Sequence, residues 1–180
     1  MFTTIIITKP IFFDGEAERI SGLLSQENIG FLHIRKPGSA PENVEKLLVD
    51  IPRSMHDRLV LHDHFGLAIR YGLHGIHLNS RCPSPPDGWK GSVSRSCHTL
   101  EEVRMWKERC DYVSLSPVFD SVSKQGYRSA FTEEDIRRAV DDGVIDDKVY
   151  ALGGVTFARL AAVEAMGFGG AMILGDAWRE

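Results

Sequence analysis

The chain has 180 residues, of which 43% are hydrophobic and 26% charged, the balance of a folded globular protein rather than a disordered or fibrous one. Acidic residues outnumber basic ones by 25 to 21, for a formal net charge of −4, so no broad basic surface exists to hold nucleic acid. No apolar run approaches the roughly 18 residues that cross a bilayer. We therefore expect no nucleic-acid partner and no membrane insertion, and one domain over residues 1–180.

The first residues, MFTTIIITKP, have no basic residue before the apolar run and no small-residue cleavage site, unlike a signal peptide. The three cysteines, Cys82, Cys97 and Cys110, are odd in number and lack CxxC spacing. This argues against a disulfide framework and against a zinc knuckle. We expect a cytoplasmic protein.

Short apolar runs alternate with amphipathic stretches along the whole chain. Many of these runs are nearly continuously apolar, as the strands of a parallel sheet covered on both faces must be. The predicted strands are residues 3–7, 31–34, 59–61, 75–78, 92–94, 112–115, 149–152 and 171–174. The predicted helices are residues 16–24, 41–49, 100–107, 133–140 and 157–166.

Helix starts are marked by Pro41 and by two capping boxes, Thr99 with Glu102 and Thr132 with Asp135. Strands that alternate with such helices form βαβ units, and eight units predict a (β/α)8 TIM barrel. A last helix would begin near residue 176, so we expect it to be short or missing. The side of the barrel left uncovered there is compatible with a homodimer.

An internal echo supports repeated units. YGLHGIHL (residues 71–78) and MGFGGAMI (166–173) each place one glycine near a helix end and another just before a strand. These glycines fit a left-handed helix C-cap followed by close backbone packing.

The active site of such a barrel lies at the carboxyl ends of its strands. Polar residues and glycines follow several predicted strands here: His33, Arg35, His62, Asp63, His64, Asn79, Ser96, His98, the 116–126 loop, Gly153, Gly154, and Leu174 with Gly175. These residues are the candidates for substrate binding and catalysis.

Five segments, FLHIRK, SRSCHTLEEV, DYVSLSPVFDSVSKQG, ALGGVT and GFGGAMILGDAW, together resemble the thiamine phosphate synthase/TenI superfamily of (β/α)8 enzymes. The resemblance extends over nearly the whole chain. It implies one of two activities. Synthases join a pyrimidine pyrophosphate to a thiazole phosphate, with magnesium carrying the pyrophosphate. TenI-like tautomerases move a proton to make the thiazole ring aromatic and need no metal.

The chain departs from the synthase pattern after strand two. His33 stands where synthases have a glutamine, Arg35 matches, and Pro37 replaces an expected lysine. The synthase Asn-Asp pair appears as His62-Asp63, so Asp63 remains a magnesium ligand if the enzyme is magnesium-dependent.

The synthase segment Gly-Gln-Glu-Asp appears as residues 79–82, Asn-Ser-Arg-Cys. Magnesium prefers oxygen ligands, so Cys82 does not replace the aspartate, and Arg81 would repel the ion. Arg95 also looks more like TenI than like a synthase. We therefore favour the TenI branch, with no cofactor expected, over a synthase that uses Mg2+.

Other positions match both branches. Ser96 and His98 stand where the family has serine and histidine, and Ser121, Ser123 and Lys124 occupy the anion-binding positions of the strand-six loop. Gly153, Gly154, Leu174 and Gly175 are expected to present backbone amides to a phosphate. Asp176 would either cap the last helix or repel the phosphate, and plain αβ turns would also explain the glycines.

We expect His98, Arg35 and His62 to be catalytic. Imidazole both takes and delivers a proton near neutral pH, as a tautomerisation requires. The alternative for His98 is that it only occupies a helix start. His62 is expected to approach the carboxylate or ring of the substrate, while Asp63 orients an imidazole or Arg35. The alternative for His62 and His64 is a zinc site completed by His98 or Asp63, or ordinary hydrogen bonding.

Several functions thus remain open: a TenI-like enzyme that acts on a thiazole phosphate, a thiamine phosphate synthase, a binding or regulatory protein that kept only the fold, and a metal hydrolase. The small-molecule partner implied by the resemblance is a thiazole phosphate.

Overall fold

The computed structural model describes residues 2–120 and 129–179. Within them, eight strands follow one another in a closed order from β1 to β8, the topology of the predicted (β/α)8 barrel. The strands are β1 (Thr3–Ile7), β2 (Ile29–Ile34), β3 (Leu59–Leu61), β4 (Gly75–Leu78), β5 (Ser92–Cys97), β6 (Tyr112–Leu115), β7 (Val149–Ala151) and β8 (Gly170–Ile173). The helices are α1 (Glu16–Leu24), α2 (Pro41–Asp50), α3 (Phe65–Tyr71), α4 (Leu100–Trp106), α5 (Glu133–Asp141) and α6 (Leu160–Ala165). The 3₁₀ turns are η1 (Arg53–Arg58), η2 (Phe157–Arg159) and η3 (Asp176–Trp178).

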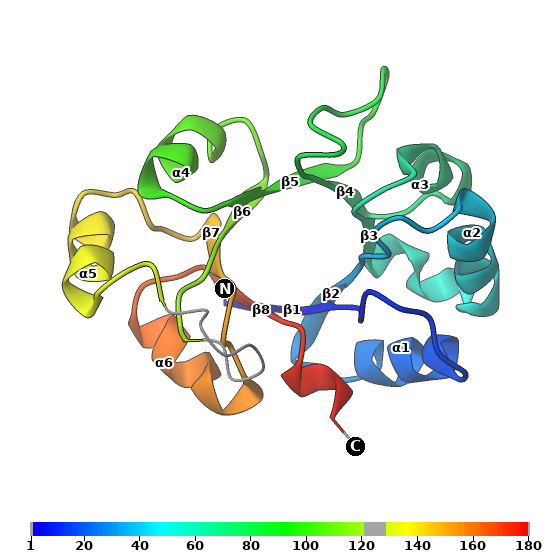
Figure 1. Cartoon of the computed structure of the whole chain (residues 1–180), viewed down its shortest axis with the longest axis horizontal. Coiled ribbons are helices and arrows are strands. Elements are labelled where there is room, and N and C mark those ends of the chain that lie inside the picture. Colours follow the sequence, from blue (N-terminus) through cyan, green and yellow to red (C-terminus); the bar gives the residue numbers. More distant parts are fainter. Residues whose placement is uncertain (1, 121–128, 180) are drawn as a thin grey trace. The chain divides into compact units, whose positions relative to one another are not determined.

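The chain divides into two compact units. The first unit comprises Met1–Ile5 and Ser94–Glu180, and the second comprises Ile6–Val93. In the second unit, β2, β3 and β4 pair in parallel, and α1, α2 and α3 lie along their outer side (Figure 1). In the first unit, β5 to β8 pair in parallel, with α4 packed on β6 and α6 on β8.

The helix starts follow the predicted chemistry. Thr132 and Asp135 form the full capping box of α5, in which each side chain accepts a backbone N–H of the other residue. Thr99 caps α4 by accepting the N–H of Glu102, but the Glu102 carboxylate accepts from His98 N instead of closing the box. None of the described helices is long and apolar enough to span a membrane.

The internal echo is confirmed. Gly72 and Gly167 take the positive φ angles, 60° and 92°, of left-handed helix ends. The second glycine of each echo packs closely: a Cβ on Gly75 would lie 2.9 Å from Ser92 O, and one on Gly170 would lie 2.7 Å from the Tyr150 ring. The first glycine of each pair is therefore required by its left-handed φ angle, and the second by the lack of space for a Cβ atom.

Two helices differ from the prediction. The sequence patterns miss α3. Its N-cap residue, His64, has a left-handed backbone and makes no capping hydrogen bond, and its first turn contains Gly66, so neither a capping side chain nor a proline marks the start of the helix. The helix predicted over residues 157–166 begins as η2 and becomes α6 only at Leu160. After β8 the described chain forms only the three-residue turn η3, as the expectation of a short last helix anticipated.

Candidate active site

Three histidines of the second unit share one face of its sheet. His33 of β2 pairs with Val60 of β3, and Val60 pairs with Gly75 of β4. Paired residues point to the same side of a sheet, and side chains alternate with a period of two. His62 and His77, two residues beyond Val60 and Gly75, therefore lie on the face of His33. We call this the inner face.

The three imidazoles are in contact. His33 Nδ1 lies 2.9 Å from His62 Nε2, and the His62 and His77 rings stack with centroids 4.2 Å apart. Their exposed fractions are 0%, 5% and 1% in chain order. Burial, reinforced by neighbouring imidazoles, lowers the pKa of His33 and of His62 well below the usual range. Both rings are therefore neutral at pH 7, and one nitrogen of the close pair donates while the other accepts.

Asp63 is engaged by Arg81. The Arg81 guanidinium donates from Nε to Asp63 Oδ1 at 2.9 Å and from Nη2 to Oδ2 at 3.1 Å. Asn79 holds this loop in place, because its side-chain oxygen accepts from the N–H groups of Arg81 and Cys82. A bidentate guanidinium occupies both carboxylate oxygens and repels a cation. The residues therefore do not fit the magnesium site that the resemblance to synthases would require.

His64 does not join His62. It has φ 55°, in the left-handed region, and its Nε2 lies 2.8 Å from Ser39 O. The backbone leaves the extended conformation at this residue, so the two histidines do not point to one side as residues i and i+2 of a strand would. The three residues after β3 are thus a buried His62, an Asp63 paired with Arg81 and a His64 bound to the loop at Ser39.

The two cations after β2 differ in their surroundings. The Arg35 backbone N–H donates to Thr8 Oγ1 at 2.9 Å, and the residue is half-buried. Lys36 is 2% exposed, and its ammonium donates to Glu16 Oε1 at 2.6 Å and to two backbone carbonyls of the segment after β1. Lys36 therefore stabilises the start of α1 and has no donor left for a substrate phosphate.

In the first unit, His98 follows β5 and is exposed. Its Nδ1 lies 3.2 Å from both the carbonyl oxygen and the Oγ of Ser116, and its backbone N–H donates to Glu102. Ser96, two residues earlier, pairs with Ser114 and so lies on the same side of β5. The contact with Ser116 orients the His98 ring, and this ring is open to solvent.

Arg95 lies on the opposite side of β5. It pairs with Val113, and its guanidinium stacks 3.9 Å from the ring centroid of Trp106 in α4. Arg95 is thus part of the contact between strand and helix. Its likeness to TenI does not place it among substrate-binding residues.

Gly153 and Gly154 follow β7 with φ 92° and 64°. A Cβ on Gly153 would lie 2.7 Å from Pro117 Cα, and one on Gly154 would lie 2.8 Å from Phe119 Cβ. The loop after β6 also bonds to this turn, because Phe119 N donates to Gly153 O at 3.1 Å. Close packing within the protein therefore requires these glycines. Among the described residues, neither glycine N–H donates a backbone bond, so an anion remains a compatible partner.

The end of β8 differs from the expected helix start. Leu174 is half-buried and Gly175 exposed, and only the turn η3 follows them. A turn of three residues lacks the aligned peptide dipoles that make a longer helix attract anions. Asp176 does not cap η3; its Oδ2 accepts the N–H of Phe157 at 2.9 Å and so stabilises the start of η2.

Ser121, Ser123 and Lys124 lie outside the described residues, so their anion-binding role stays a prediction.

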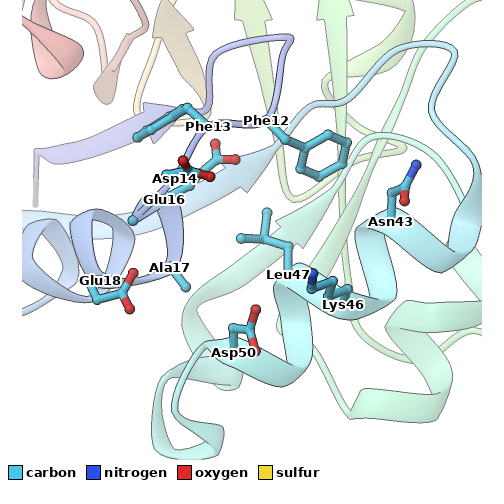
Figure 2. A pocket seen from close by; sticks show the side chains of 11 residues that line it. Phe12, Phe13, Asp14, Glu16, Ala17, Glu18, Asn43, Lys46, Leu47 and Asp50 are labelled. Carbon is cyan, nitrogen blue, oxygen red and sulfur yellow. The ribbon is translucent and has the colours of Figure 1, made fainter.

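A cavity of about 480 Å³ in the second unit lies between α1 and α2 (Figure 2). The side chains of Glu18, Lys46 and Asp50 line it, together with Phe12 and Leu47. Asp14 and Glu16 add further carboxylates. Because acidic groups dominate, the cavity is a poor match for a phosphate. None of the predicted site residues lines it.

Sequence reasoning missed His77 and did not single out Ser116 within the 116–126 candidate loop. His77 was available from the alternation in GIHL, where a histidine stands two residues from the glycine that starts the strand. Ser116 carried no signal beyond its position at a strand end, because its contact with His98 joins residues 18 positions apart.

Comparisons with known proteins agree with the fold. A family model described as thiamine monophosphate synthase (TMP-TENI) matches residues 5–175. The thiamine-phosphate synthase of Parasynechococcus marenigrum is 29% identical over 144 residues, which are 75% of this chain and 40% of that protein. The enzyme of the same name from Thermus thermophilus is 32% identical over 107 residues, 57% of this chain and 51% of that protein. The chain thus spans about half or less of these two relatives.

A solved structure is more similar. The thiamine phosphate pyrophosphorylase of Bacteroides thetaiotaomicron shares 42% identity, with a TM-score of 0.88 over 98% of this chain and 85% of that one.

Proposed function

Because the chain belongs to the thiamine monophosphate synthase (TMP-TENI) family, we propose that it is a thiamine-biosynthesis enzyme that binds a thiazole phosphate. Within the family we place it in the TenI-like branch, as a tautomerase that moves a proton on the thiazole ring without a metal. A cytoplasmic location and a homodimer are further parts of this proposal.

The observation that carries the choice of branch is the ion pair of Asp63 and Arg81. A synthase needs carboxylates for the magnesium that carries the pyrophosphate. Here both oxygens of Asp63 already accept hydrogen bonds from a guanidinium, and the resemblance puts Cys82 where synthases have the second carboxylate. Tautomerisation needs no such ion.

We propose that His98 is the group that transfers the proton. Its exposed imidazole, oriented by Ser116, can take a proton from one ring atom of the substrate and return one to another. If Nδ1–H donates to Ser116 O, then Nε2 carries the lone pair that acts as the base. The tautomer follows from that hydrogen bond.

The proposal that the chain binds a phosphate rests on residues other than Asp63 and Arg81. The Gly153 and Gly154 turn offers two backbone N–H groups, and Ser96 shares the face of His98. Ser121, Ser123 and Lys124 are proposed to complete the anion site, with Leu174 and Gly175 at its edge. In the second unit, Arg35 and His62 are proposed as catalytic residues and His33 as a substrate-binding residue.

A second candidate function is thiamine phosphate synthesis. It is favoured by the names of the relatives and by the Bacteroides structure at 42% identity. Magnesium dependence separates the two candidates.

The test is a pair of assays on the full chain. In the first, a non-aromatic thiazole phosphate tautomer is supplied without metal, and we expect conversion to the aromatic form. In the second, pyrimidine pyrophosphate, thiazole phosphate and Mg2+ are supplied, and we expect little thiamine phosphate. Product at ordinary enzyme turnover in the second assay would assign the chain to the synthase branch. Calorimetry that finds no thiazole phosphate binding at millimolar concentration would argue for a protein that kept only the fold.

A further inference from the structure

His33, His62 and His77 are arranged as ligands of one metal ion. One ring nitrogen from each lies within 4.8 Å of the other two, and the closest pair is 2.9 Å apart. Three nitrogens around a tetrahedral zinc lie about 3.4 Å from one another, since Zn–N bonds are about 2.0–2.1 Å. The observed separations bracket this distance. The His62 and His77 rings stack at an interplanar angle of 22°, so they must turn out of this stack before three nitrogen lone pairs meet at a common centre.

The supports of these side chains are rigid. His33 and His77 lie within β2 and β4, and His62 follows β3 directly, so adjacent strands set their spacing. The Asn79 side chain donates to the His62 carbonyl oxygen at 2.6 Å and holds the end of β3. Ligands placed on strands are positioned more precisely than ligands on loops.

We propose that His33, His62 and His77 bind one zinc-like transition-metal ion, with a fourth position for water or an anionic ligand. The donor set is all imidazole, which suits zinc, copper, nickel or cobalt and does not suit magnesium or calcium. Three protein nitrogens with an open fourth position is the arrangement of catalytic rather than structural zinc.

Charge points to the nature of the fourth ligand. Arg35 and Arg81 both lie close enough to His62 to act on it electrostatically. The Asp63 carboxylate is already paired with Arg81. With two guanidinium groups near a dication and no unpaired carboxylate from Asp63, an anion in the fourth position would offset the positive charge. Hydroxide, or a carboxylate or phosphate oxygen, meets this need.

By the resemblance, synthases carry glutamine at the position of His33 and asparagine at that of His62, so two amides have been exchanged for imidazoles. Glutamine and asparagine are also sound test residues, because both keep polar side chains of similar size. The proposal does not depend on the thiazole phosphate activity.

The experiment uses the full chain, stripped with a chelator and then titrated with ZnCl2 by calorimetry. We expect one ion per chain. His33→Gln, His62→Asn and His77→Gln should each weaken binding at least about 100-fold, since the loss of an outer partner alone costs about 10–100-fold. His64→Asn is the matched control and should bind as the unaltered chain does; asparagine tolerates its left-handed backbone. Cobalt(II) in place of zinc should give the visible absorption of a four-coordinate site.

A second measurement uses the unaltered chain, so its result does not depend on whether the variants fold. In ¹⁵N-edited spectra of the histidine rings, zinc should shift the signals of His33, His62 and His77 together. Absence of a stoichiometric site in the unaltered chain would overturn the proposal. So would ring shifts confined to His64 and His98, or undiminished binding by folded His33→Gln and His62→Asn.

Discussion

His98 Nδ1 lies 3.2 Å from the carbonyl oxygen of Ser116 and equally far from its Oγ. This contact joins the ends of β5 and β6 within the first unit, and it places the Gly153 turn nearby, since a Cβ there would meet Pro117. An exposed histidine and two glycine N–H groups thus lie around one short loop. That combination can hold an anion and move a proton.

His98→Ala should reduce tautomerase turnover by about 10² to 10⁴, the usual contribution of a positioned acid/base group. Because His98 is exposed, the free energy of unfolding of the His98→Ala protein, measured in urea, should differ from that of the unaltered chain by no more than about 0.5 kcal/mol. Ser116→Ala is the matched variant: the carbonyl acceptor remains, so the loss should be much smaller. Equal turnover by His98→Ala and the unaltered chain would remove His98 from the mechanism.

Gly153→Ala should destabilise the fold by more than about 1 kcal/mol, because an alanine must adopt φ 92° and press against Pro117. Gly175→Ala is the control, since φ there is −61° and a Cβ would meet no described atom within 4 Å. It should leave stability unchanged or raise it by up to about 1 kcal/mol. Urea denaturation measures both; equal midpoints would show that the Gly153 packing is unimportant.

Lys36→Met should cost about 3–5 kcal/mol at pH 7, because it leaves the Glu16 carboxylate buried without its cation. Burial already raises the pKa of Glu16 above its usual 4.5, although Lys36 opposes this. A raised folded-state pKa contributes stability that is present below the unfolded pKa and is lost as the pH rises through the folded pKa.

The penalty of Lys36→Met should therefore grow as the pH rises from about 4.5, where Glu16 can take up a proton. Denaturation at several pH values checks this, with the exposed Lys46→Met as control. A penalty that shrinks as the pH rises would contradict the account.

Arg81→Asp should create weak magnesium binding, which we do not expect of the unaltered chain. The change removes a repelling guanidinium, releases Asp63 and adds a second carboxylate in the same loop. Arg81→Gln releases Asp63 without adding the second ligand and should bind less tightly. Calorimetry with MgCl2 distinguishes the three proteins, and tight binding by the unaltered chain would refute the metal-free assignment.

The sequence predicts the strands because most of them are short apolar runs bounded by turn residues, and the closed topology confirms the fold class. Helix caps such as that of Thr132 and Asp135 join residues three positions apart, so the sequence predicts them directly. The helix α3 was not predicted, because a left-handed histidine starts it.

Prediction of the site was weaker, for a physical reason. The grouping of His62 with His33 and His77 depends on the strand register, which joins residues far apart in the chain. The partnership of Asp63 with Arg81 is likewise invisible in sequence, although the repulsive effect of Arg81 on a cation was foreseen from its charge. The role of the Gly153 turn in close packing emerged only with its neighbours in place.

The most direct test of the central claim follows solvent deuterium into a thiazole phosphate by NMR, in magnesium-free D2O. The account predicts that the unaltered chain converts the non-aromatic tautomer to the aromatic one with exchange at the ring, and that His98→Ala is slower by about 10² to 10⁴. No conversion by the unaltered chain, together with magnesium-dependent formation of thiamine phosphate, would contradict it.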